Sequence, residues 1–210
     1  MTVLATDDFN RTAGTLGVNW TTISAAHNPL ITASAQSVVK SSGTFSPSAI
    51  IAGAVFNAVT WPNDQYSQIA LVTLGSGATQ GIGAVVRCDP AARNFYYAEL
   101  AEKLALDTAT LRLRRISLGV TADIATATLV SVTVGALLRV AAQGTTIRAF
   151  VNGVVALTAT DVTIISGQAG IILIAAQTTI PRLDDWEGGD FSVTGAAFVI
   201  KTRLLLGVGR

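Results

Sequence analysis

Short runs of alternating hydrophobic and polar residues recur along most of the chain, separated by residues that favour turns. In residues 65–74 (QYSQIALVTL), a strand would place Tyr66 and Gln68 on one face and Ile69 and Leu71 on the other. Each such run therefore predicts a strand with two chemically different faces.

The strongest local signal lies in residues 145–160, where two alternating runs flank Asn152-Gly153. Asn-Gly is the preferred pair in the two-residue type I′ turn, because both of its residues tolerate a positive φ. These residues are therefore predicted to form a β-hairpin with strands over 145–151 and 154–160.

The remaining runs predict about a dozen strands at spacings of roughly 8–12 residues, as in all-β sandwiches. They cover residues 4–9, 18–23, two short segments within 27–40, 48–59, 65–74, 81–88, 94–102, 110–118, 129–134, 137–142, 170–176 and 182–191. A helix over Tyr96–Asp107 is an open alternative, because Ala, Leu, Glu and Lys favour helices. We favour a strand there, because strand patterns flank the segment. The fold class predicted is an all-β, antiparallel jelly-roll β-sandwich.

The composition excludes some classes of function but does not identify one. Only 13% of the 210 residues are charged and the net charge is +1, so the basic field of a nucleic-acid binder is missing. No segment approaches the roughly 20 apolar residues of a membrane span, and the first residues lack the pattern of a secretory signal. So few charges suggest that a partner covers part of the surface.

Five segments in a fixed order resemble a known superfamily. They are DDFNR (7–11), GTLGVNW (14–20), TWPNDQYSQIAL (60–71), LRVAAQGTTIRAFVNGVVAL (138–157) and RLDDWEGGDF (182–191). Together they resemble the concanavalin A-like lectin/glucanase superfamily, in its laminin-G-like jelly-roll branch as found in phage and bacterial structural proteins. The resemblance implies a jelly-roll domain over residues 1–191 and an added segment over 192–210.

The resemblance also implies that the first and last strands lie side by side. That pairing would gather the acidic residues Asp7, Asp8, Asp184 and Asp185. Such a cluster is a candidate Ca²⁺ site, because Ca²⁺ takes carboxylate oxygens. The alternative, which we favour, is that the acids face solvent, cap turns or pair with arginine.

Glycanases of this superfamily carry an E-x-D-x-E strand, in which carboxylates on one face act as nucleophile and acid. The three glutamates of this chain are Glu99, Glu102 and Glu187. In a strand, Glu99 and Glu102 would lie on opposite faces. The motif is therefore absent, and we do not expect glycoside hydrolysis.

Three other features are weak candidates for chemistry. Residues 77–83 match the glycine spacing of a nicotinamide-binding loop, but an apolar strand pattern follows instead of a helix. His27 and Cys88 are the single histidine and the single cysteine. We interpret His27 as a solvated or core-edge residue and Cys88 as a small buried hydrophobic residue. We therefore predict a protein that is not an enzyme and needs no cofactor.

Aromatic residues could form a platform on which sugars stack, although in a sandwich they usually fill the core. The best candidate is the segment around the Trp61 loop, because loops position most sandwich binding sites. The candidate glycan-binding residues are Trp61, Asn63, Asp64 and Tyr66.

The last segment, residues 192–210, has no acidic residue and contains Lys201, Arg203 and Arg210. An unpaired apolar strand is an aggregation hazard, so we expect it to pair with its own sheet or with a neighbouring subunit. Its candidate partner-binding residues are Phe198, Ile200, Lys201, Arg203, Leu204 and Leu206.

These observations predict a non-catalytic structural protein of a phage virion, either a capsid decoration (cement) protein or a tail-associated protein. Its expected partners are major capsid or tail proteins and its own copies, in a homo-oligomer such as a trimer. The alternative is a lectin-like module that binds host glycans. Neither nucleic acid nor a membrane is an expected partner.

Overall fold

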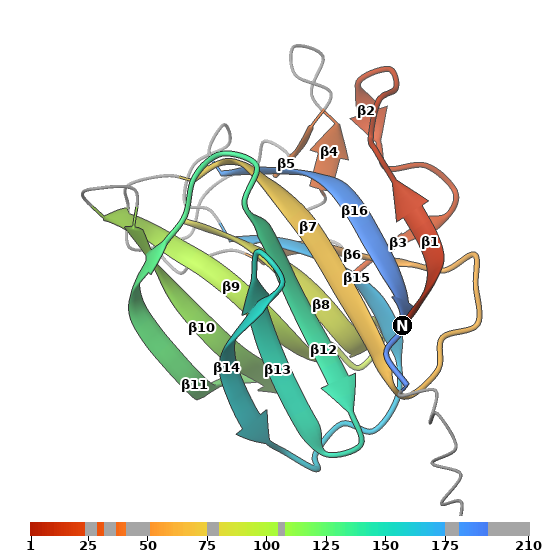
Figure 1. Cartoon of the computed structure of the whole chain (residues 1–210). Helices are drawn as coiled ribbons and strands as arrows, with labels where there is room; N and C mark the ends of the chain where they lie inside the picture. Colours follow the sequence, from red (N-terminus) through yellow and green to blue (C-terminus); the bar gives the residue numbers. More distant parts are fainter. Residues whose placement is uncertain are drawn as a thin grey trace, which may run out of the picture.

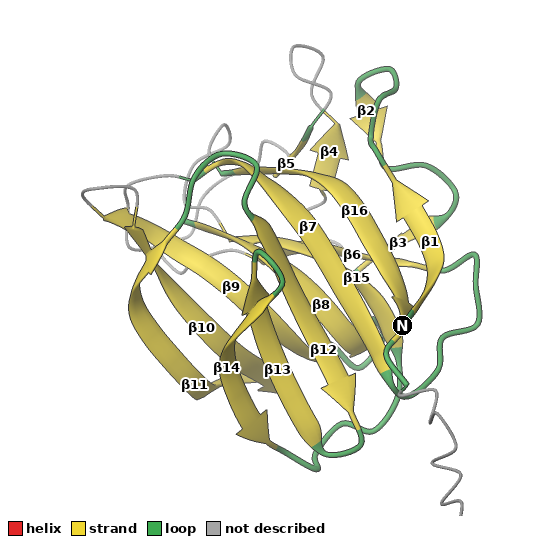
Figure 2. Cartoon of the chain, in the orientation of Figure 1, coloured by secondary structure: helices red, strands yellow, loops and turns green. Residues whose placement is uncertain are grey.

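A computed structural model describes residues 1–23, 29–31, 37–40, 51–74, 80–104, 108–174 and 181–192. His27 and the predicted partner-binding segment 198–206 lie outside these residues. Two antiparallel sheets face each other across the described part of the chain (Figures 1 and 2). No helix among the described residues is long and apolar enough to cross a membrane.

Sheet A is nine-stranded in the described residues and faces the viewer in Figure 1. Its order is β14 (Val154–Thr160), β13 (Thr146–Val151), β12 (Leu137–Gln143), β7 (Gln65–Thr73), β16 (Arg182–Asp190), β5 (Val38–Lys40), β4 (Pro29–Ile31) and β2 (Gly14–Thr15), with β1 (Thr2–Asp7) paired to β16. Sheet B has the order β11 (Val120–Ser131), β10 (Thr108–Ser117), β9 (Asn94–Leu104), β8 (Gly81–Asp89), β15 (Gln168–Ile174), β6 (Ile51–Phe56) and β3 (Trp20–Thr22).

This architecture confirms the predicted all-β jelly-roll sandwich. Most predicted strands are present within a few residues of their expected ends. Strand β9 runs through Asn94–Leu104 and pairs with β8 and β10, so the alternative helix over Tyr96–Asp107 is wrong. Pairing to strands on both sides overrides the local helix preference of Ala, Glu and Leu.

Two tight turns show what the sequence pattern detected and what it missed. The predicted hairpin is confirmed, with β13 and β14 joined through Asn152 (φ 50°) and Gly153 (φ 80°). A second two-residue turn with positive φ, Leu118 (φ 51°) and Gly119 (φ 77°), joins β10 to β11. The predicted strand over 129–134 is misplaced: β11 begins at Val120 after this turn and ends at Ser131, so only residues 129–131 of the prediction lie in it.

The main core lies between the sheets and includes Phe56, Ile69, Leu71 and Trp186. The two predicted faces of residues 65–74 are confirmed for β7. Ile69 and Leu71 belong to the main core, while Tyr66 forms a separate small cluster with Ala141 and Phe150. That cluster lies on the outer face of sheet A, away from sheet B, and Phe191 packs against it.

Strands β1 and β16 lie side by side, as the resemblance implied (Figure 1). Their register places Thr6 opposite Glu187 and Asp7 opposite Trp186. The two strands approach so closely at Gly189 that a Cβ there would lie 2.1 Å from the Thr2 carbonyl oxygen. Glycine is therefore required at position 189 for this pairing.

Candidate functional site

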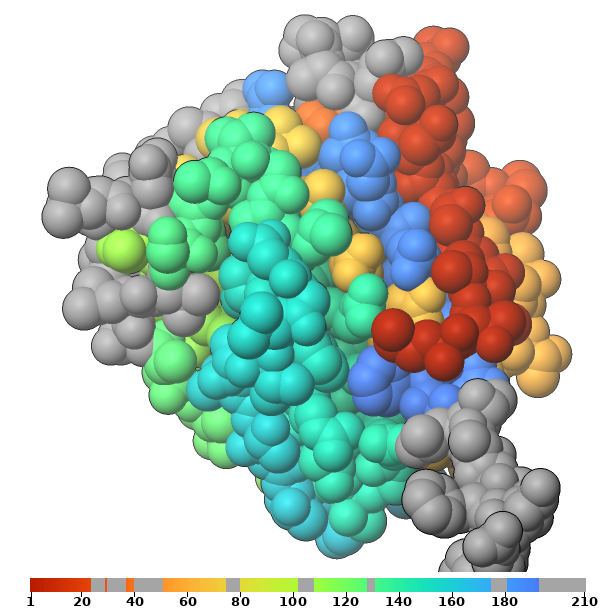
Figure 3. Space-filling view, viewed as in Figure 1, coloured from red at the N-terminus to blue at the C-terminus, as the bar shows by residue number. Residues whose placement is uncertain are grey.

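A row of side chains crosses the outer face of sheet A over five neighbouring strands. Residues that lie directly opposite one another on paired strands project to the same face. The register therefore aligns Thr6 (β1), Glu187 (β16), Gln68 (β7), Arg139 (β12) and Phe150 (β13). Figure 3 shows this face of the molecule as a surface.

Hydrogen bonds between its members and Tyr66 hold this row in place. The Tyr66 hydroxyl donates to Glu187 Oε1 at 2.6 Å, and Arg139 donates from Nε and Nη2 to Gln68 Oε1 at 3.0 and 2.7 Å. The Arg139 guanidinium also lies 5.0 Å from the centre of the Tyr66 ring. Burial and the neighbouring Glu187 carboxylate raise the pKa of Tyr66, so its hydroxyl stays protonated and keeps donating.

A β-bulge in β16 sets the acidic residues beside this row. Asp184 pairs with Ala70 and Glu187 pairs with Gln68, so Asp185 and Trp186 together face the single residue between those partners. Asp185 accordingly has a positive φ of 45°. The extra residue leaves Trp186 buried while Asp185 is exposed next to Glu187.

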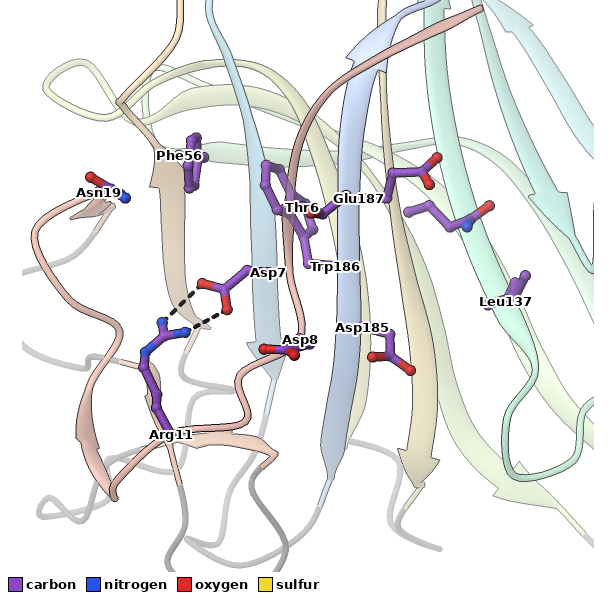
Figure 4. A pocket seen from close by; sticks show the side chains of 11 residues that line it. Thr6, Asp7, Asp8, Arg11, Asn19, Phe56, Leu137, Asp185, Trp186 and Glu187 are labelled. Carbon is purple, nitrogen blue, oxygen red and sulfur yellow. Dashed lines mark hydrogen bonds and ion pairs between the residues drawn. The ribbon is translucent and has the colours of Figure 1, made fainter.

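A cleft of about 620 Å³ opens at this bulge (Figure 4). It extends from Gln68 and Leu137 on the outer face of sheet A to Asn19 and Phe56 beside the end of β1. Its charged lining residues are Asp7, Asp8, Arg11, Asp185 and Glu187. The cleft therefore combines hydrogen-bond donors and acceptors with the apolar surfaces of Phe56, Leu137 and Trp186.

Asp7 has a structural role in this cleft. Its carboxylate accepts hydrogen bonds from both terminal nitrogens of Arg11, from Trp20 Nε1 at 2.8 Å and from the Phe9 amide at 2.9 Å. These bonds fix the end of β1 and the loop that follows it. The pairing of Arg11 with Asp7 agrees with the arginine interpretation that the sequence favoured.

The other acidic residues nearby are held mainly by backbone amides. Asp8 accepts from the Asn10 amide, which lowers its pKa, while burial raises the pKa of Asp184. Among the described residues, no group of three or more His, Cys, Asp or Glu side chains is placed to hold a metal ion. Both Asp7 oxygens already accept N–H donors, so Asp7 is not free to act as a Ca²⁺ ligand.

The candidate residues in the Trp61 loop mainly stabilise the fold. Trp61 is half-buried, donates from Nε1 to the Phe56 carbonyl at 2.8 Å and packs edge-on against Trp186. The Asn63 carbonyl accepts from Arg87 Nε at 2.9 Å, and the Asp64 carboxylate accepts from the Gly144 amide at 2.7 Å. No aromatic side chain that the structure describes is exposed, and Tyr66 itself is only 1% exposed.

Two other residues considered for chemistry are buried. Cys88 is fully buried, and burial raises the pKa of its thiol, which makes the reactive thiolate scarce. Glu99 is also buried, and its carboxylate accepts from Arg114 Nη1 at 3.1 Å. Both therefore serve the packing of sheet B.

The sequence interpretation missed Gln68 and Arg139 as site residues. The signal was present in residues 137–143, where Leu138 and Val140 alternate with Arg139. In the structure Leu138 and Val140 are fully buried in the main core, which places Arg139 on the outer face. A basic residue on the exposed face of a central strand was thus a detectable candidate.

No protein-family model matches the sequence, and no curated protein matches it. Solved structures do match. The carbohydrate-binding module CBM66 from Bacillus subtilis is 14% identical, with a TM-score of 0.57 over 84% of this chain and 96% of that one. A Bacillus subtilis protein of unknown function with a galectin-like fold is 15% identical, with a TM-score of 0.55 over 82% of this chain and 89% of that one.

The catalytic domain of an endo-1,3-β-glucanase (laminarinase) from Thermotoga petrophila RKU-1 is 10% identical, with a TM-score of 0.54 over 91% of this chain and 98% of that one. Binding modules and an enzyme thus share this architecture, and at such identities the likeness concerns the fold alone. The chain therefore has the jelly-roll fold that these carbohydrate-binding, galectin-like and glucanase structures share.

Proposed function

We propose that this protein is a non-catalytic glycan-binding module whose site is the cleft beside the ends of β1 and the β16 bulge. The observation that supports this most is the mixed lining of the cleft, with carboxylates of Asp185 and Glu187 next to the Gln68 amide. Sugar hydroxyls both donate and accept hydrogen bonds, so they match such a lining. The similarity to a carbohydrate-binding module agrees with this assignment.

The charge of the cleft points to neutral glycans. Arg11 forms its ion pair with Asp7, and the lining contains three further carboxylates, those of Asp8, Asp185 and Glu187. An anionic sugar placed among them would be repelled, whereas hydroxyl groups would donate to them. Binding without hydrolysis is proposed because the sequence lacks the E-x-D-x-E strand of the glycanases.

Replacing Asp185 with asparagine is expected to weaken binding of neutral oligosaccharides about tenfold, because one charge-assisted acceptor becomes a neutral one. The measurement is isothermal titration calorimetry with the oligosaccharides that bind best on a glycan array. Asp123→Asn is the matched control, because it removes an exposed carboxylate from β11 in the other sheet. An array without neutral hits, or equal binding by Asp185→Asn, would contradict the proposal.

A second candidate is the structural role in a phage virion that the sequence predicts. The observation that favours it is β14, which ends sheet A and contains no charged residue among its seven. Val154 and Val155 on this strand are 70% and 48% exposed. Natural edge strands usually carry charges that prevent pairing, so an uncharged edge suits contact with a neighbouring subunit.

Under this second proposal the purified protein is a homo-oligomer, and Val155→Lys shifts it toward the monomer because a charge enters the edge contact. Light scattering coupled to size-exclusion chromatography measures the mass of both forms. The control is Arg93→Lys, which introduces a lysine in the exposed β8–β9 turn, away from β14. Thr158→Lys would not be an equivalent control, because Thr158 lies on β14 itself. A wild-type protein that stays monomeric and binds neither capsids nor tails would contradict it.

A further inference from the structure

A second cavity lies on the outer face of sheet A, next to the cleft but with a different lining. It has a volume of about 360 Å³, and its lining residues are Met1, Arg139, Gln143, Phe150, Gly153, Phe191 and Ser192. We call it the Arg139 pocket. The cleft and this pocket are neighbours because Gln68, which lines the cleft, accepts hydrogen bonds from Arg139.

The Arg139 guanidinium is held in one orientation, but one of its nitrogens contacts only a weak hydrogen-bond acceptor in the described part of the chain. Its Nε and Nη2 atoms donate to Gln68 Oε1, and its plane lies near the aromatic rings of Tyr66 and Phe150, at 5.0 and 5.9 Å from their centres. In the described part of the chain Nη1 contacts the Met1 thioether sulfur at 3.3 Å, which is a weak acceptor. A strong acceptor in the pocket can therefore displace a weak one at a guanidinium that is already positioned.

The rest of the lining also suits an anion. Among the described residues, no acidic residue lines the Arg139 pocket, whereas four line the cleft. Gln143 Oε1 accepts from Arg148 Nη1 at 3.0 Å, which leaves the Gln143 amide N–H groups as donors. Phe150 and Phe191 lie edge to face with 5.9 Å between their ring centres and supply an apolar wall.

We propose that the Arg139 pocket binds the carboxylate of an acidic sugar, a hexuronate unit. The carboxylate part of this assignment follows from Arg139 and the acid-free lining, because a guanidinium pairs strongly with a carboxylate. The sugar part rests on the proposed glycan-binding function of the adjacent cleft. A glycan that carries neutral and uronate units would then be bound in one orientation, with neutral units in the cleft and the uronate at Arg139.

The test is a titration of ¹⁵N-labelled protein with D-glucuronate, D-glucose and acetate, monitored through the amide signals of residues 137–143, 150 and 191. D-Glucuronate is expected to bind about tenfold more tightly than D-glucose and than acetate, because only it supplies both the carboxylate and the ring. Arg139→Gln is expected to weaken D-glucuronate binding about tenfold or more.

Gln143→Glu is a second variant, which leaves Arg139 in place and adds a repelling carboxylate to the pocket wall. It too is expected to weaken the binding of D-glucuronate. Arg93→Gln is the control: it removes a positive charge at an exposed turn and is expected to leave D-glucuronate binding unchanged. Equal binding of D-glucose and D-glucuronate overturns the carboxylate assignment. Equal binding of acetate overturns the sugar assignment.

The Arg139 pocket and the cleft give separate outcomes in these titrations. If neutral oligosaccharides bind in the cleft while D-glucuronate causes no shift at the Arg139 pocket, only the inference is wrong. If D-glucuronate binds in an Arg139-dependent manner while no neutral glycan binds, the carboxylate site at Arg139 is supported and the glycan-binding assignment of the cleft is wrong.

Discussion

Replacing Trp186 with alanine is expected to reduce the free energy of unfolding by about 4 kcal/mol, the typical cost of deleting a buried tryptophan. Trp186 is 1% exposed, and its ring centre lies 4.8 Å from that of Trp20 and 5.2 Å from that of Phe56. Its Nε1 also donates to the Ser67 hydroxyl at 2.9 Å. Urea unfolding followed by fluorescence and circular dichroism measures the loss.

Trp186→Phe is the control that separates the two contributions of this side chain. It keeps an aromatic ring in the core and removes the N–H donor, so we expect a loss of about 1–2 kcal/mol. Because Trp186 also lines the cleft, the folded fraction of Trp186→Ala is expected to bind glycans more weakly than the wild type. Equal stability of the alanine variant and the wild type would show that the aromatic cluster is not the centre of the core.

Replacing Arg87 with methionine is expected to destabilise the fold by about 3–4 kcal/mol, because buried polar partners lose their donors. Arg87 is only 2% exposed and donates to the carbonyls of Asn63, Ile164 and Gly144 at 2.9, 3.1 and 2.8 Å. Three loops at one end of the sandwich are thus joined by one guanidinium. Urea unfolding measures the difference, with the slope checked for constancy.

Arg87→Lys is the matched variant for this prediction. Lysine keeps the positive charge near Asp64, which lies 3.6 Å from Arg87, but its single ammonium lacks the planar fork that reaches three carbonyls. We expect the free energy of unfolding of Arg87→Lys to lie between that of the wild type and that of the methionine variant. If lysine restores full stability, charge alone accounts for the role of Arg87 and the three carbonyl contacts contribute little.

Turn chemistry explains why the strand pattern was predicted so unevenly. The Asn152-Gly153 pair predicted the β13–β14 hairpin, because both residue types accept a positive φ at little cost. Leu118 adopts the same backbone region at φ 51°, although leucine is unfavourable there. The pairing of β10 with β11 along the whole hairpin compensates for that local cost, and leucine at the first turn position gives no turn signal in the sequence.

The site was harder to predict than the fold, for a related reason. Strict alternation cannot reveal an inserted residue, so the bulge at Asp185 and the cleft beside it followed only from pairing with β7. The acidic cluster itself was predictable from the implied pairing of β1 and β16. Tyr66 was a candidate for an exposed sugar platform, but Phe191 packs beside it and its hydroxyl is bonded to Glu187.

The position of β16 in sheet A has a consequence for the order in which the protein folds. This strand lies between β1 and β7, yet it is the last strand of the described chain to be synthesised. Until it emerges from the ribosome, the edge of β7 lacks its partner and Trp186 is missing from the core. Sheet A therefore closes late, through contacts of large sequence separation, and the nascent chain presents an open strand edge to other chains until then.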